Sequence, residues 1–273
     1  MCRHTHGWGY VARRRDGMVG YIGNVCARNH GHINAEFAEK FRLEAKRIER
    51  ENRIANSVAR IVAHKQTPGL TETIQADLAR QRALASKISS TRLALPPKVH
   101  LALVDMVKRG NRNIRALTRH TEIEVDENGR KRERVRLEPF ILGVVDAPDA
   151  LDLDGIRSVG VVLMQAAVAL EDSVADATLG EEILKGWQES LDAYPLARTA
   201  LDTSERAYEL FMQNENLKLL PWIVDHGNDR DRIAAFILER QQLPHQPSHA
   251  QAAMGRWRTA IMEREGGRPF QLA

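Results

Sequence analysis

Apolar residues recur at helical spacing through residues 34–92. The pattern predicts a long amphipathic helix that begins at Asn34 and breaks at the Pro-Gly pair 68–69. A second helix follows and could fold back on the first as an antiparallel hairpin. Glu44 and Glu51 interrupt the apolar stripe, which favours packing within the chain over a coiled coil between two chains. The stripe consists of Phe37, Phe41, Ile48, Ala55, Val58 and Val62.

Two other stretches alternate polar and apolar positions, as half-buried strands do. In residues 1–33, the runs YVARRR and MVGYIG flank an Asp-Gly pair, which predicts a β-hairpin. Residues 93–145 begin with two prolines and a helical pattern, and they continue as a second predicted hairpin around the turn sequence DENG. Each predicted hairpin therefore carries basic residues beside its turn.

Residues 146–273 are acidic and helical in pattern, and their proline-containing breaks predict about four to six helices. The apolar run at 159–170 is shorter than the roughly 20 residues that a membrane-spanning helix needs, so we expect a buried helix and no membrane partner. The last residues, EGGRPFQLA, predict a loose tail. The expected fold is mainly α: a helical bundle with a small N-terminal ββα module and one additional β-hairpin.

Composition supports the helical interpretation and suggests a compartment. Apolar residues make up 43% of the chain but aromatic residues only 5%, so the core must consist mostly of Leu, Ile, Val and Ala. The first residues lack the pattern of a secretory signal. The chain has 2 cysteines, which without such a signal argues for a reducing, cytoplasmic location. Cysteine beside histidine then favours metal binding over a disulfide.

Charge divides the chain into two halves. Residues 1–136 contain 28 Lys and Arg against 14 Asp and Glu, a balance of +14, and residues 137–273 contain 12 against 22, a balance of −10. A strongly basic half predicts a polyanionic partner, here nucleic acid bound through residues 1–136. The acidic residues 146–273 would then contact another protein. The alternative is that the two halves pair with each other.

Basic residues cluster beside the predicted turns and at the end of the helix that precedes the second hairpin. Such long cationic side chains are expected to contact phosphates and to carry no base readout. A helix, a basic turn and a basic hairpin across residues 97–137 also suit a winged-helix arrangement, with Arg115 at the same edge. The choice between DNA and RNA stays open. The predicted phosphate contacts are Arg13, Arg14, Arg15, Lys108, Arg109, Arg112, Arg130, Lys131, Arg132 and Arg134.

Both cysteines lie among histidines, in the stretches MCRHTHG and NVCARNHGH. The order of a Cys-x-His turn, a β-hairpin and a Cys-x3-His helix start resembles a treble-clef zinc finger over residues 1–33. This resemblance implies one structural zinc ion held by four side chains. It also implies His6 and His32 as substitutes or supporting groups. The implied ligands are Cys2, His4, Cys26 and His30.

The same segment loosely resembles metal-dependent nucleases of the His-Asn-His type, which gives an enzymatic alternative. That resemblance implies His6 as the group that activates water, Asn24 as its orienting residue, and His4 with His30 or His32 completing the site. No Asp precedes the histidine pair, however, and the cysteines would then have no role. The chain also lacks Gly-rich phosphate loops and nucleophile elbows.

The function expected is that of a non-enzymatic, zinc-containing, nucleic-acid-associated accessory or regulatory protein. Its basic half would hold the phosphate backbone. The rival hypotheses are a protein–protein adaptor without nucleic-acid binding and the metal-dependent nuclease.

Overall fold

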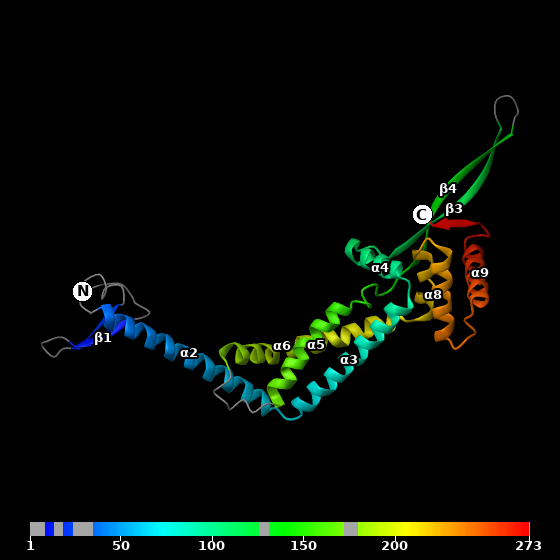
Figure 1. Ribbon diagram of the computed structural model, residues 1–273. Helices are drawn as coiled ribbons and strands as arrows, with labels where there is room; N and C mark the ends of the chain where they lie inside the picture. The colour runs from blue at the N-terminus through cyan, green and yellow to red at the C-terminus, as the bar shows by residue number, and fades with distance from the viewer. Residues whose placement is uncertain (1–8, 14–18, 24–34, 126–130, 172–179, 273) are drawn as a thin grey trace.

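The computed structural model describes residues 9–13, 19–23, 35–125, 131–171 and 180–272 (Figure 1). Over these residues the protein is mainly helical, as predicted, with a small three-stranded antiparallel sheet. The helices are α2 Ala35–Lys65, α3 Leu70–Ala94, α4 Pro97–Arg109, α5 Leu153–Glu171, α6 Glu181–Phe211, α7 Asn214–Leu217, η1 Leu220–Ile223, α8 Gly227–Arg240 and α9 Pro247–Arg264. The strands are β1 Gly9–Arg13, β2 Val19–Gly23, β3 Asn113–Val125, β4 Lys131–Val144 and β5 Phe270–Leu272.

Both predicted hairpins are present. Strands β1 and β2 pair antiparallel, with Gly9 opposite Gly23. Strands β3 and β4 pair along their whole length, and β5 adds to β3 at Ala116, Leu117 and Thr118. Figure 1 shows β1, β2 and the start of α2 at one end of an elongated molecule, and the β3–β4 hairpin at the other.

The central core is formed by α3, α5 and α6, which pack against one another (Figure 1). Leu78, Leu163 and Leu191 represent the three helices in this core, and all are buried. Among the described helices, only α5 is long and apolar enough to cross a membrane by length and composition. In the structure only one face of α5 is buried, where it packs on α3 and α6, so the expectation of a buried helix holds for that face alone.

Helix α2 does not fold back along α3 as the sequence suggested. Gly69 takes a left-handed conformation with φ +71°, which redirects the chain. The second half of α2 packs mainly against α6, which lies more than 100 residues further along the chain. Its buried face contains Ile54, Val58 and Ile61, whereas Ala55 and Val62 of the predicted stripe are exposed.

Helix α6 continues through Pro195, where the sequence predicted a break. A proline inside a helix removes one backbone hydrogen bond. Here the packing of Leu191, Tyr194 and Ala197 against the core keeps the helix continuous, and these residues are buried on both sides of the proline.

The same core continues to the C-terminal end of the chain, where the sheet meets η1, α8 and α9. The predicted loose tail is wrong here, because β5 pairs with β3 and Phe270 is buried. The Phe270 ring makes edge contacts with Phe140 and Trp222, at centroid distances of 6.0 Å and 5.5 Å. Apolar burial and three ladder positions thus fix the end of the chain to the foot of the hairpin.

Asn216 also fixes the foot of this hairpin to the helical body, where the chain leaves β4. Its buried side-chain amide donates to the backbone carbonyls of Asp146 and Phe211, at 3.1 Å and 2.9 Å, and its oxygen accepts from the Asp146 backbone N–H at 2.8 Å. The chain leaving β4 is therefore held against the end of α6.

Candidate nucleic-acid interface

The β3–β4 hairpin forms a ribbon that projects from the helical body (Figure 1). The ribbon is defined here as residues 113–125 and 131–144. Beyond the three positions paired with β5, it is two-stranded. At about 3.3 Å per residue, residues 113–125 span about 40 Å. One bulge, between Ile114 and Arg115, lies at the foot of the ribbon where the strands leave the body.

Side chains alternate between the two faces of the ribbon. We call one of these the polar face, which packs on the body at the foot through Ile114 and Ala116. Further out, this face carries equal numbers of carboxylates and guanidinium groups. They are Glu122, Glu124 and Glu138 with Arg132, Arg134 and Arg136.

Charged and polar side chains contact one another on the polar face, between the strands and along β4. Arg134 Nη1 lies 2.7 Å from Glu124 Oε1, and His120 Nε2 lies 2.9 Å from Glu138 Oε2. Arg136 lies 3.7 Å from the same Glu138 carboxylate. The hydrogen bond from Arg134 to Glu124 and the charge of that carboxylate raise the pKa of Arg134 above its usual value. The polar face therefore largely neutralises its own charge.

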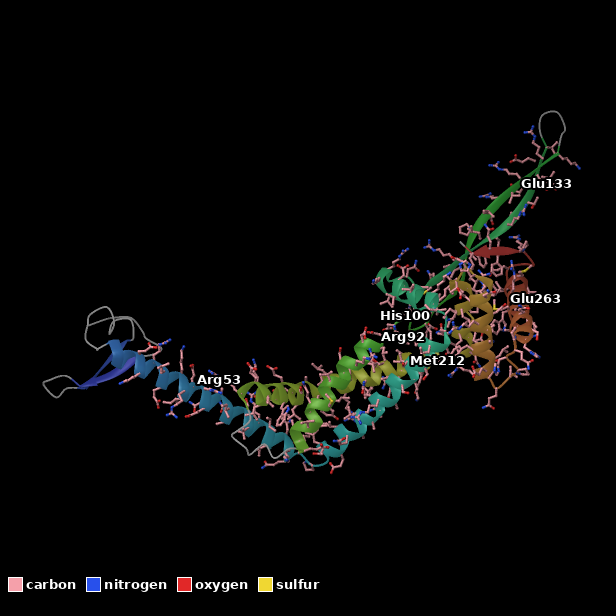
Figure 2. All side chains as sticks on the ribbon, viewed as in Figure 1. Arg53, Arg92, His100, Glu133, Met212 and Glu263 are labelled. Atoms are coloured by element: carbon pink, nitrogen blue, oxygen red, sulfur yellow. The ribbon has the colours of Figure 1, made fainter. Side chains whose placement is uncertain are left out.

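The opposite face, which we call the apolar face, is composed differently. Besides Leu117 and Val144 at the foot, this face has five large aliphatic side chains that are between 44% and 62% exposed. They form a row from the foot to the tip, and Figure 2 shows the labelled Glu133 of the same face near the tip. No described segment covers them. These residues are Ile141, Leu137, Val135, Ile123 and Val125.

Three cations flank this aliphatic row. Arg115 and Arg119 lie toward the foot, and Lys131 lies near the tip opposite Val125. None of the three side chains has an ion-pair or hydrogen-bond partner within the described part of the chain. Glu133 is the one carboxylate on this face among the described residues. The apolar face thus combines exposed aliphatic side chains with a net positive charge.

The end of α4 adds cations at the foot of the ribbon. Gly110 ends the helix in a left-handed conformation, with φ +60°. Lys108 and Arg109 lie exposed in the last turn of α4, and Arg112 lies exposed in the connection to β3. Arg109 pairs with Asp105 at 2.9 Å. Lys108 and Arg112 have no such partner among the described residues.

The structure thus separates the predicted phosphate contacts into groups. Lys108, Arg109 and Arg112 lie together at the foot, and Lys131 lies on the apolar face. Arg132 and Arg134 lie on the polar face, where Arg134 is already paired. The positions Arg14, Arg15 and Arg130 lie outside the described residues, as does the side chain of Arg13 in β1.

The predicted metal ligands Cys2, His4, Cys26 and His30 also lie outside the described residues. So do the alternative groups His6, Asn24 and His32. Within the described part of the chain, no group of three or more His, Cys, Asp or Glu side chains is arranged to hold a metal ion.

Sequence reasoning grouped the cations of the second hairpin by their position beside the turn and missed their division between faces. The signal was present, since residues of equal parity share a face of a strand. Arg119, which was not singled out from the sequence, lies on the apolar face for this reason.

Two hollows lie elsewhere on the described surface. A cleft of about 640 Å³ between α2 and α6 is lined by Arg53, Arg60 and Lys185 among others, and the Arg53–Glu181 ion pair of 2.6 Å spans it. A smaller one of about 240 Å³, between β4 and α9, contains Trp222 and Trp257. The charged side chains that line the two hollows also link helices and strands to one another. At the second hollow, Arg264 of α9 donates to the Leu142 carbonyl of β4 at 2.7 Å.

Arg92 and His100 lie together near the start of α4 (Figure 2), with Arg92 Nη2 3.0 Å from His100 Nε2. Burial, followed by the charge of Arg92, lowers the pKa of His100. This histidine is therefore held neutral, which suits a structural contact between α3 and α4.

No protein-family model matches the chain, and no curated protein and no solved structure matches it either. The function must therefore be argued from the chemistry of the surface.

Proposed function

We propose that the protein is a non-enzymatic, nucleic-acid-associated accessory factor whose ribbon and α4 end bind the phosphate backbone. One observation carries this proposal: the ribbon projects from the body and bears cations without partners from foot to tip. Phosphate binding is largely electrostatic, so cations that are not already paired within the protein contribute most to it. These cations are Lys108, Arg112, Arg115, Arg119, Lys131 and Arg132.

The dimensions of the ribbon agree with this role. Proteins that bind DNA through a β-ribbon place their strands in the major or the minor groove of the duplex. The length of about 40 Å is close to one helical turn of the duplex, which is about 34–36 Å. Cations at the foot and at the tip could therefore reach phosphates about one turn apart.

For the acidic half we propose contact with a second protein. Helix α5 leaves Val161, Met164 and Val168 exposed, at the i, i+3 and i+7 spacing of a single helix face. An apolar stripe on an acidic region suits a protein partner better than a polyanion.

The experiment for nucleic-acid binding is a salt titration of the full chain with a random duplex. We expect affinity to fall steeply with salt, with a slope of about 0.9 per phosphate contact in a plot of log affinity against log salt concentration. Absence of binding at low salt, or binding that does not depend on salt, would remove the proposal.

A second candidate, the protein–protein adaptor, is favoured by the aliphatic row on the apolar face, because exposed apolar patches mark interaction sites. Salt dependence separates the two candidates. An adaptor would show no affinity for random duplexes.

We also propose one structural zinc ion held by Cys2, His4, Cys26 and His30. Metal analysis of the full, untagged chain should find one zinc per chain, and Cys26→Ser should lose it while the helical content of the body is retained. Finding no zinc in the unaltered protein would contradict this. Metal-dependent cleavage of DNA that Asn24→Ala abolishes would instead support the nuclease alternative.

A further inference from the structure

We infer that the apolar face of the ribbon, and not its more arginine-rich polar face, is the face that lies on duplex DNA, with its aliphatic row in the minor groove. This inference rests on the proposed function and adds to it the side of the ribbon and the groove that it contacts.

Charge distinguishes the two faces. On the polar face, Arg134 and Arg136 are in ion pairs with Glu124 and Glu138, so their binding of phosphate means breaking or sharing those pairs, and Arg132 lies opposite the carboxylate of Glu124. The apolar face offers Arg115, Arg119 and Lys131 against the single carboxylate of Glu133. The apolar face therefore has a net positive charge that attracts a polyanion, whereas the net charge of the polar face is close to zero.

The aliphatic row indicates which groove of the duplex the ribbon contacts. Strict alternation of polar and apolar positions is typical of a strand with one covered face, but in the described structure the row is open to solvent. Aliphatic side chains form no hydrogen bonds with base edges, and in the major groove they contact only the methyl group of thymine. Proteins of the minor groove do use such side chains, which wedge between base steps and bend the duplex.

The position of the cations agrees with this arrangement. Arg115 and Arg119 lie opposite Ile141 and Leu137 in the half of the row nearer the foot, and Lys131 lies opposite Val125 near the tip. With Ile123, Val135 and Leu137 on the groove floor, the cations at both ends would reach the phosphates that border the groove.

A second copy of the chain suits the apolar face less well. Face-to-face packing of two such ribbons would oppose surfaces that each carry three cations and one carboxylate. Like charges brought together at an interface disfavour association. The charge balance therefore favours an anionic occupant.

The test compares two variants of the full chain that lose the same charge. One is Arg115→Ser with Arg119→Ser and Lys131→Ser on the apolar face. The other is Arg132→Ser with Arg134→Ser and Arg136→Ser on the polar face. Because the net charge changes equally, a difference between the variants reports local contact. Each variant is titrated against a random duplex over a range of salt concentrations.

We expect the apolar-face variant to reduce the salt slope by about 3, at about 0.9 per lost contact, and the polar-face variant to reduce it by less than 1. In a duplex labelled at both ends, we expect energy transfer to show bending by the unaltered protein. Val135→Ser with Leu137→Ser should bend the duplex less. Circular dichroism checks that each variant is folded.

The failures can be distinguished. Equal losses in the two charge variants, or a larger loss on the polar face, overturn the inference and leave nucleic-acid binding in place. Binding without any bend overturns the minor-groove assignment. If the unaltered chain is dimeric by light scattering and Val135→Ser with Leu137→Ser makes it monomeric, the apolar face belongs to a second copy. Absence of binding by the unaltered chain removes the proposed function itself.

Discussion

Charged side chains have different surroundings in the helical body and in the ribbon. In the body, Asp77 lies between α3 and α6 with its side chain only 3% exposed. It accepts hydrogen bonds from Arg80 Nη1 at 2.7 Å and from the Tyr194 hydroxyl at 2.8 Å, and Arg198 lies 3.5 Å away. On the ribbon, Arg134 and Glu124 form a pair of similar length while both remain more than half exposed.

The difference in burial decides what these charges do. A buried carboxylate is costly to leave without partners. The partners of Asp77 therefore require α3 and α6 to pack in one arrangement. Exposed pairs contribute little to stability because water and salt screen them. Charges on the ribbon are therefore available for interaction, and the three cations of the apolar face have no partner among the described residues.

The largest effect is expected from Asp77→Ala, which leaves the buried Tyr194 hydroxyl without an acceptor and removes a partner of two guanidinium groups. Arg80 keeps Asp202 and Glu205 as partners. The free energy of unfolding should therefore fall by about 3 kcal/mol, at the low end for a broken buried pair. Urea unfolding measures this loss. Asp77→Asn, which keeps an acceptor, should lose less, and equal stability of all three proteins would contradict the role of the cluster.

A smaller effect, dependent on pH, is expected from Tyr194→Phe. Burial, and then the bond to Asp77, raises the pKa of Tyr194 to about 12. In the unfolded chain the pKa of a tyrosine is about 10. The higher pKa in the native state means that folding favours the neutral phenol of Tyr194. This stabilisation is present in full below pH 10 and is lost as the pH rises from 10 to 12.

Below pH 10, Tyr194→Phe should cost about 1 kcal/mol, the usual net value of a hydrogen bond. Above pH 10, the unaltered protein should lose stability faster than the variant. Unfolding curves at several pH values between 8 and 12 check this. If the stability of both proteins falls equally as the pH rises, Tyr194 is not the titrating group.

The smallest effect is expected from Arg134→Ser on the polar face of the ribbon. Since Arg134 is exposed and its pair with Glu124 is screened, we expect no measurable change in the melting temperature. A clear decrease would mean that the polar face has a structural role similar to that of the Asp77 cluster, and the contrast between the two regions would not hold.

Local features of the fold followed from the sequence, and distant contacts did not. Turn residues and alternation predicted the hairpins, and apolar spacing predicted α2 and α5. The tail failed as a prediction because Phe270 pairs with a strand about 150 residues earlier, and no local pattern signals that pairing. Pro195 was misleading because tertiary packing outweighs a single broken hydrogen bond.

The candidate site was predictable in part for the same reason. Clusters of basic residues beside a turn can be found in the sequence, and residue parity would have assigned them to faces. Which cations are already paired depends on the register of β3 with β4. This register places Arg134 opposite Glu122 and diagonal to Glu124, the carboxylate with which it forms an ion pair. The zinc ligands stay a prediction, since they lie outside the described residues.

Cross-linking from adjacent positions of β4 tests most directly that the ribbon binds duplex DNA through its apolar face. Val135 and Arg136 are neighbours in sequence but lie on opposite faces of the ribbon. A photoreactive phenylalanine analogue is placed at one position or the other in the full chain, which is then irradiated with a labelled duplex. The account predicts a strong cross-link from position 135 and a weak one from position 136. A stronger cross-link from position 136, or equal cross-links from both, would contradict it.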